Sequence, residues 1–204
     1  MAEVMAELAA LEDPKARAVN EKHGDDHGVN LGKLRALATR LKTQQELARR
    51  LWETDDTAAK LLAMLICRPK AFERDELEVM LRKARTPKVH DWLVNYVVKK
   101  NPHAEELRLA WYPDPDPVVA SAGWALTTDR VAKKPEGLDL PGLLDVIEAD
   151  MLSVRAHLDH RDGPPTARQV GGRAASRRSP PGVVQGCLTA RTWRTFRLLV
   201  LARG

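Results

Sequence analysis

The stretch that decides the fold is residues 86–117, TPKVHDWLVNYVVKKNPHAEELRLAWYPDPDP, because it repeats one helix-start signal. Thr86-Pro87, Asn101-Pro102 and Asp116-Pro117 each place a capping side chain before a proline, at intervals of 15 residues. A capping oxygen accepts a hydrogen bond from a free N–H of the first helical turn, and proline at that position loses no bond. Each interval therefore predicts one helix of about three turns and a short connecting turn.

Helical spacing of apolar residues extends this pattern towards the N-terminus and beyond residue 117. The predicted helices include residues 31–42, 45–53, 57–67, 74–83 and 140–151. No segment alternates apolar and polar residues, so strands are not expected. Helix pairs that recur about every 30 residues indicate a HEAT-like α-α solenoid, a right-handed stack with an extended concave surface. An irregular all-α bundle fits the same spacing equally well.

Charge divides the chain into two parts. Residues 159–204 contain nine arginines, no lysine and two acids, whereas residues 1–158 contain 24 bases and 26 acids. The formal net charge of +5 therefore comes from the C-terminal part. That part is rich in Arg, Gly, Pro and Ser and has no apolar periodicity, except for a short helix expected at residues 192–202. We predict a helical domain over residues 1–158 and a poorly ordered tail over residues 159–204. A reading-frame change near residue 159 would also produce such an abrupt change in composition.

Several classes of protein are excluded by composition. No apolar run approaches the roughly 18 residues that a membrane span needs. The acidic N-terminus lacks the basic-then-apolar pattern of a secretory signal. Two cysteines, Cys67 and Cys187, provide neither a disulfide framework nor a zinc site. We therefore expect a cytoplasmic monomer that uses no membrane, metal or cofactor.

The densest cluster of potential metal ligands is residues 23–27, HGDDH. A second pair of ligands is missing nearby, so we predict a solvated turn rather than a metal site. We likewise interpret His157 and His160 as solvated residues rather than metal ligands. Phosphate-binding glycine loops, nucleophile elbows and catalytic Cys/His signatures are also absent from the sequence.

Residues 87–100 combine an apolar and a polar stripe on one predicted helix. The apolar stripe, expected to face the core, consists of Val89, Trp92, Leu93 and Tyr96. The opposite stripe consists of Lys88, Asp91, Asn95 and Lys99. Lysines there can hold phosphates, and a carboxylate between them can stabilise a developing cation. Lys88 and Asp91 also fit an ordinary surface pair worth a few tenths of a kcal/mol, roughly.

Two further residue sets allow alternative interpretations. Four tryptophans either fill the core or contact nucleotides from the concave face: Trp52, Trp92, Trp111 and Trp124. Eight cations either form a basic stripe along the array or belong to a solvated face: Lys33, Arg35, Arg82, Lys83, Arg85, Lys88, Lys99 and Lys100.

The order and spacing of several motifs resemble the DNA alkylation repair (AlkD-like) family over roughly residues 27–152. Residues 27–38, HGVNLGKLRALA, are similar to the GV-x-x-x-x-LR-x-LA opening of that family. The likeness continues through ELARRLW at 46–52, LLA at 61–63, Asp91-Trp92, Asn101-Pro102 and AGW at 122–124.

This resemblance implies a HEAT-like solenoid whose concave face grips duplex DNA. The better-studied members of the family are glycosylases that excise positively charged N-alkylated purines without a cofactor. Such a purine is a good leaving group, and a nearby carboxylate can stabilise the oxocarbenium-like sugar that remains. The family pairs an Asp with a Trp on one helix and adds an Arg from a following helix and another Trp.

The resemblance assigns roles to residues of this chain. Asp91 would be the cation-stabilising carboxylate, Trp92 a supporting aromatic residue, and Asn95 would orient water or the backbone. The expected DNA contacts are Lys33, Arg35, Lys88, Lys99, Lys100, Ser121 and Trp124.

This chain also departs from the family pattern. Tyr96 stands where the family spacing puts its Asp, and Ser121 stands where its Arg is expected. The resemblance implies a DNA alkylation repair protein that binds duplex DNA, particularly alkylated DNA. A catalytically inactive helical module that binds DNA or a protein partner is the alternative, and a purely structural helical domain is a third.

Overall fold

The computed structural model describes residues 1–149, and this range is helical except for turns and one isolated antiparallel bridge between Glu12 and Val29. The predicted tail, the boundary near residue 159 and the two histidines His157 and His160 lie outside the described residues. The α-helices are α1 Ala2–Ala10, α2 Pro14–Glu21, α3 Leu31–Leu41, α4 Gln45–Trp52, α5 Thr57–Ile66, α6 Arg74–Lys83, α7 Pro87–Trp92, α8 Ala104–Trp111 and α9 Pro117–Lys133. Residues 140–149 are also helical.

The repeated cap-proline signal is confirmed in full at only one of its three positions. Asp116 accepts a hydrogen bond from the backbone N of Val118 (3.0 Å), and α9 begins at Pro117. Thr86 precedes α7 but makes no side-chain cap. Asn101 is buried and donates to the carbonyls of Pro69 (2.8 Å) and Phe72 (2.9 Å), so its amide joins two turns. As a result α8 begins only at Ala104.

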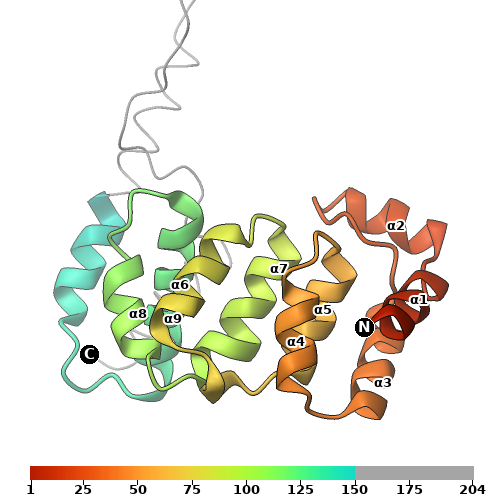
Figure 1. The fold of residues 1–204 in the computed structure, drawn as a ribbon. Helices are drawn as coiled ribbons and strands as arrows, with labels where there is room; N and C mark the ends of the chain where they lie inside the picture. Colours follow the sequence, from red (N-terminus) through yellow and green to blue (C-terminus); the bar gives the residue numbers. More distant parts are fainter. Residues whose placement is uncertain (150–204) are drawn as a thin grey trace, which may run out of the picture.

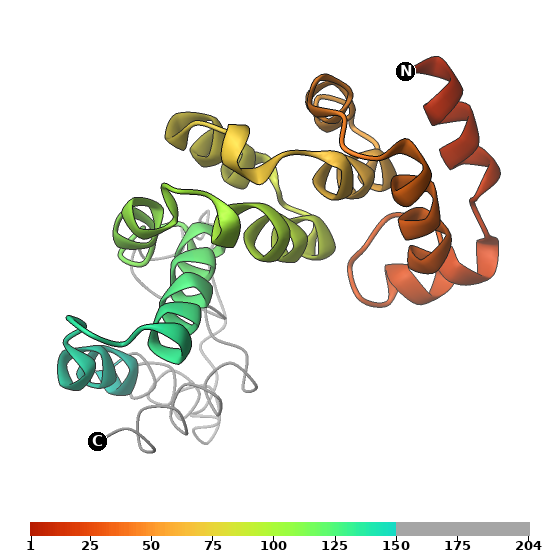
Figure 2. The same ribbon diagram turned by 90° about the horizontal axis from the view of Figure 1, so that it is seen from below.

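Helix pairs stack along the chain, as the spacing predicted. Successive helices run back and forth across the array from α4 to α9 (Figure 1). Helices α3, α5, α7 and α9 follow the inner side of an arc, and α4, α6 and α8 follow its outer side (Figure 2). This arrangement confirms a curved helical stack and excludes the closed bundle.

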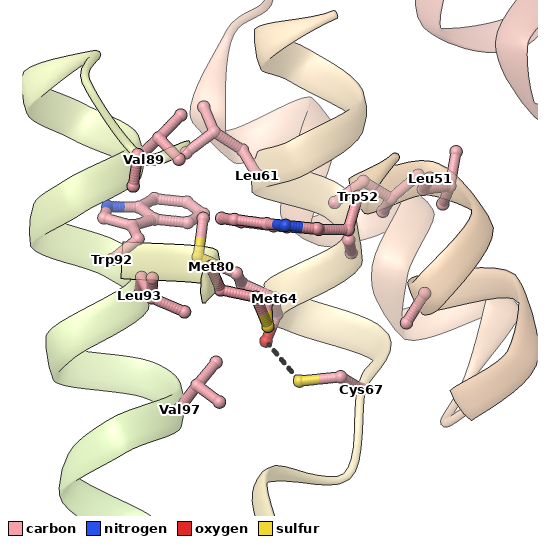
Figure 3. Packing of buried hydrophobic residues seen from close by; sticks show 14 of the residues in the cluster. Leu51, Trp52, Leu61, Met64, Cys67, Met80, Val89, Trp92, Leu93 and Val97 are labelled. Carbon is pink, nitrogen blue, oxygen red and sulfur yellow. Dashed lines mark hydrogen bonds between the residues drawn. The ribbon is translucent and has the colours of Figure 1, made fainter. Parts of the chain in front are cut away.

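One apolar cluster extends from α1 to α9 and holds the stack together. Figure 3 shows Trp52 and Trp92 pointing into this cluster together with Met64 and Met80. Helix α5 is apolar on nearly every side, as expected of a helix surrounded by α1, α3, α4 and α7. Burial of each large side chain there contributes about 1.5–3 kcal/mol.

The four described tryptophans are core residues. Their exposed fractions are 5% for Trp52, 4% for Trp92, 0% for Trp111 and 2% for Trp124. The prediction that Trp124 contacts DNA is therefore wrong in this structure: its indole lies edge-on to Tyr112 at 5.8 Å inside a smaller apolar cluster. Trp92 packs in the main apolar cluster, and its role beside Asp91 stays a prediction.

Helix α7 changes its winding after one and a half turns. It passes into a π-helical segment, Leu93–Val97, and then into a 3-10 segment, Val98–Lys100. Val94, Val97 and Val98 of these two segments are buried in addition to the predicted stripe. Within residues 1–149, helices long and apolar enough to cross a membrane are not found.

Candidate nucleic-acid interface

Three polar residues of the predicted stripe form a hydrogen-bonded ladder on the α7 segment. The Asn95 amide donates to both the Asp91 carboxylate and the Asp91 carbonyl, at 2.8 Å each. The Lys99 ammonium donates to the Asn95 side-chain oxygen at 2.7 Å. Asp91 and Asn95 are exposed, so Asn95 holds the Asp91 carboxylate in place while leaving it open to solvent.

The neighbours of α7 decide where this ladder faces. Helix α5 packs on one side of the α7 segment and α9 on the other. The apolar stripe of the α7 segment faces the core. The exposed side that remains is the inner side of the arc, where α7 and α9 lie together (Figure 2). Asp91 and Asn95 are thus exposed residues of a helical segment that follows the inner side of the arc.

The ladder continues from α7 to α9. The Lys99 ammonium lies 3.7 Å from the Asp129 carboxylate, and Lys133 contacts the same carboxylate at 2.8 Å. The charge of Lys99 is therefore partly neutralised by Asp129, an acid that the sequence analysis did not identify. The spacing of Asp129 and Lys133, one helical turn apart, was the available signal.

Two cations on this surface lie against aromatic rings. The Arg35 guanidinium, from α3, lies 5.3 Å from the Trp92 ring centre, and the Lys100 ammonium lies 5.5 Å from that of Tyr96. The two rings pack against each other at 5.0 Å. Within residues 1–149, Arg35, Lys100 and the exposed Lys33 form no ion pair with an acid, so their charges remain available.

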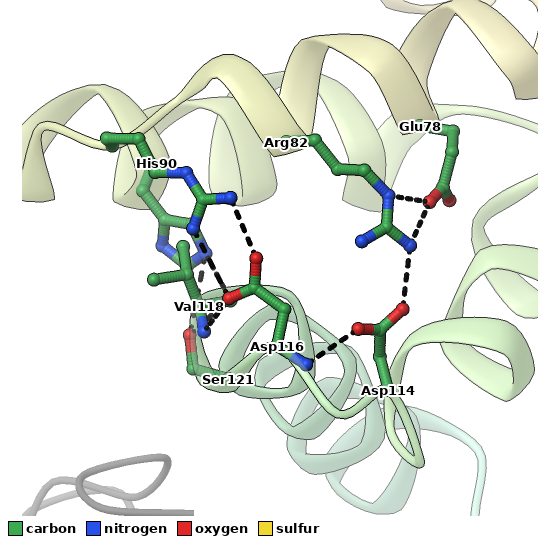
Figure 4. Close-up of polar contacts among 8 residues, drawn as sticks. Glu78, Arg82, His90, Asp114, Asp116, Val118 and Ser121 are labelled. Atoms are coloured by element: carbon green, nitrogen blue, oxygen red, sulfur yellow. Dashed lines mark hydrogen bonds and ion pairs between the residues drawn. The ribbon is translucent and has the colours of Figure 1, made fainter. Parts of the chain in front are cut away.

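The broader basic stripe is interrupted by ion pairs. Arg82 contacts Asp114 at 2.7 Å and also Glu78, and Arg85 contacts Asp116 at 2.7 Å (Figure 4). Lys83 lies 3.6 Å from Glu53. These contacts raise the pKa of both arginines, and the Arg85 guanidinium lowers the pKa of the Asp116 carboxyl. Of the two interpretations of the eight cations, a solvated face with local ion pairs therefore describes Arg82, Lys83 and Arg85, because each of the three contacts an acid.

Ser121 lies at the junction of α7 and α9 and brings no charge there. Its hydroxyl donates to the Val118 carbonyl at 2.7 Å and lies 3.5 Å from His90 Nε2 (Figure 4). His90 Nε2 also lies 2.9 Å from the Val118 carbonyl. Burial lowers the pKa of His90, so the neutral ring bonds within the protein and Ser121 is turned towards its own helix.

Residues 23–27 are not the solvated turn that the sequence predicted. Asp25 is 4% exposed and His27 2% exposed. The Asp25 carboxylate accepts from the Lys88 backbone N at 2.8 Å and so supplies the cap that Thr86 lacks. Lys88 is thereby fixed at the start of α7, on the helix that carries Asp91.

The same loop encloses a histidine without making a metal site. Asn20 donates to His27 Nδ1 at 3.3 Å and to the His27 carbonyl at 2.8 Å, while His27 Nε2 is buried without a partner. Burial lowers the pKa of His27. In the described part of the chain, no three His, Cys, Asp or Glu residues are grouped to hold a metal ion.

A sequence model of the family described as "DNA alkylation repair enzyme" matches residues 4–155. The chain belongs to this family. A search among curated proteins gives no match.

One solved structure shares the fold of this DNA alkylation repair family member. It is described as belonging to a family related to the HEAT-like repeat DNA glycosylases with affinity for branched DNA structures. The match has a TM-score of 0.62 at 24% identity and covers 72% of this chain and 64% of that one. The predicted HEAT-like fold is thus confirmed.

Proposed function

We propose that this protein binds duplex DNA through the concave surface around α7, and that it excises cationic N-alkylated purines there. The observation that carries the proposal is the exposed Asp91 carboxylate, held by Asn95 among cations of α3 and α7. The available cations, Lys33, Arg35 and Lys100, would neutralise phosphates, with smaller contributions from Lys88 and the partly paired Lys99.

The chemistry needs few groups. An N-alkylated purine leaves as a neutral base, so a general acid is not required to protonate it. The sugar left behind carries positive charge, which a fixed carboxylate stabilises best when it does not have to reorient. Asn95 supplies that fixation for Asp91, and water then adds to the anomeric carbon of the sugar and releases one proton to solvent.

Base release tests the catalytic half of the proposal. We expect the full chain to release 3-methyladenine or 7-methylguanine from alkylated duplex DNA, and Asp91→Asn to slow release about 10²–10³-fold, as loss of one electrostatic stabiliser commonly does. Asp75→Asn removes another exposed carboxylate, one that lies on α6 beside Arg74, and serves as the control. Equal release by Asp91→Asn and the wild type would remove Asp91 from the mechanism.

Salt dependence tests the binding half. Neutralised phosphates release counterions, so affinity should fall linearly with salt on a logarithmic scale, with a slope of about −0.9 per phosphate. A response close to zero would contradict DNA binding by this surface. Branched and linear duplexes should be compared, because the solved relative is described as having affinity for branched DNA.

A second candidate function is DNA binding without excision. Ser121 bonds to its own helix where a cation was expected, and Tyr96 occupies the expected place of an acid. Salt-dependent binding together with no release of either methylated base would favour this function over the first.

A further inference from the structure

Lys99 differs from the other cations near Asp91 in its surroundings. Its side chain is only 20% exposed, and its ammonium lies between two groups of the protein. One is the Asn95 side-chain oxygen at 2.7 Å, and the other is the Asp129 carboxylate of α9 at 3.7 Å. The three cations available to phosphates are exposed instead. Lys99 is therefore poorly placed to contact a phosphate and well placed to act on Asn95.

The Asn95 amide has two orientations of nearly the same shape and opposite hydrogen bonding. Its oxygen only accepts and its nitrogen only donates. The nitrogen here donates to the Asp91 carboxylate and to the Asp91 carbonyl, at 2.8 Å each. A lysine ammonium has donors and no acceptor, so Lys99 can bind only the amide oxygen. In the flipped orientation the oxygen would face the Asp91 carboxylate and the N–H groups would face the Lys99 ammonium, so both contacts would become repulsive.

Asp129 holds the Lys99 ammonium from the neighbouring helix. Its carboxylate also contacts Lys133 at 2.8 Å, one turn further along α9. On the other helix, Asn95 lies in the π-helical segment and Lys99 in the 3-10 segment that follows. π-Helical turns inside helices are frequent at functional sites. A continuous chain of polar contacts thus leads from α9 across to Asp91, through the part of α7 where the winding changes.

We propose that Lys99 is a positioning residue for Asp91: with Asp129 behind it, Lys99 fixes the Asn95 amide so that its N–H groups hold the Asp91 carboxylate. This inference rests on the proposed excision of alkylated purines, and it makes phosphate binding the secondary role of Lys99. The substrate does not have to touch Lys99. Because a stabilising carboxylate acts best when it is preorganised, loss of Lys99 should slow base release more than it weakens DNA binding.

Single-turnover base release by the full chain tests this role on a duplex that contains 7-methylguanine. A series of protein concentrations separates the maximal rate from the half-saturating concentration. We expect Lys99→Met to lower the maximal rate about tenfold, like the loss of a group that orients a metal ligand, and to leave the half-saturating concentration within about twofold. Lys99→Arg keeps the donors and should recover most of the rate. Lys83→Met is the control, because Lys83 forms a similar ion pair, 3.6 Å from Glu53, on α6.

Salt dependence separates positioning from phosphate contact. A lysine that neutralises a phosphate contributes about 0.9 to the salt slope of DNA binding, and we expect Lys99→Met to change the slope by less than half of that. A slope lowered by about 0.9 together with unchanged base release would overturn the inference. If Lys99→Met melts early, Lys99→Gln decides by the same criterion, because it keeps an N–H donor without the charge.

The Asn95 side-chain amide provides a measurement that needs neither DNA nor activity. Its pair of N–H signals in a proton–nitrogen NMR spectrum is assigned by its loss in Asn95→Asp. We expect this pair to shift in Lys99→Met and in Asp129→Asn, to return towards the wild-type position in Lys99→Arg, and to stay unchanged in Lys83→Met.

The NMR result separates this inference from the proposed function. A wild type that releases no base refutes the proposed excision, and the amide signals then decide the positioning by themselves. An Asn95 pair that is unchanged in Lys99→Met would overturn the role of Lys99, and one that is unchanged in Asp129→Asn would remove Asp129 from the chain of contacts.

Discussion

Single residues show how closely the helices of this array approach one another. Gly123 lies in the middle of α9, against the end of α8. A side chain there would place its Cβ 2.6 Å from the carbonyl carbon of Trp111, and closer still to the Tyr112 backbone nitrogen. Because backbone atoms cannot move aside as a flexible side chain can, the close packing of α8 and α9 requires glycine at this position.

Gly123→Ala is therefore expected to destabilise the fold despite the better helix propensity of alanine. Overpacking costs about 1–3 kcal/mol, and the upper end applies here because every atom nearest the added Cβ belongs to the backbone. Alanine recovers only about 1 kcal/mol, which leaves a net loss of about 2 kcal/mol. The net loss should lower the melting temperature by several degrees, at about 2–4 °C per kcal/mol. Ala110→Gly, at an exposed position of α8, is the control that measures the difference in helix propensity between alanine and glycine alone. An unchanged or raised melting temperature for Gly123→Ala would contradict the close approach of α8 and α9.

At the scale of the element, α7 begins at a position that a distant loop determines. Asp25 accepts from the Lys88 backbone N across 63 positions of sequence. The residue directly before α7, Thr86, makes no side-chain cap. The loop between α2 and α3 therefore takes part in setting the helix that presents Asp91 and Asn95.

Asp25→Ala should lower stability by about 1–3 kcal/mol, because it leaves a part-buried N–H of Lys88 without its side-chain cap. Chemical denaturation measures the loss. Asp25→Asn keeps a side-chain oxygen and should recover most of it, whereas Asp26→Ala changes an exposed neighbour. The capping role would be disproved by an alanine variant as stable as the wild type, or by an Asn variant as unstable as the alanine one.

At the scale of the whole molecule, the buried His27 and the half-buried His90 connect stability to pH. Burial lowers the pKa of both His27 and His90. Around His27, Asp25, Glu12 and Asp26 oppose this shift and Lys88 adds to it. The folded chain therefore binds fewer protons than the unfolded chain between the lowered pKa values and about 6.5, the usual value. Stability is complete above that pH and is lost as the pH falls through this window.

Urea unfolding at pH 7.5 and pH 5 measures this dependence. We expect the midpoint to fall on acidification in the wild type and to fall less in His27→Gln. His23→Gln removes an exposed imidazole and is the control. Because the pKa values of the Asp116 and Glu105 carboxyls are lowered, their contribution to folding stability is lost only at a lower pH than that of the two histidines. A wild-type midpoint that is the same at both pH values would contradict the burial of the neutral rings.

The sequence determined the helical class, the paired repeat and the core stripe of α7, because these depend on caps and on residues three or four positions apart. The same local spacing placed Asp91, Asn95 and Lys99 on one ladder, although their roles in binding or catalysis stay predictions. Motif order also indicated the family, which the match over residues 4–155 confirmed.

Only the tertiary structure decided which polar groups meet across the stack. It buried Trp124, neutralised Arg82 with Asp114, and brought Asp25 to the start of α7. These pairings join residues 30 or more positions apart or depend on helix stacking, and helical periodicity contains no information about which distant side chains the packing of the core brings together.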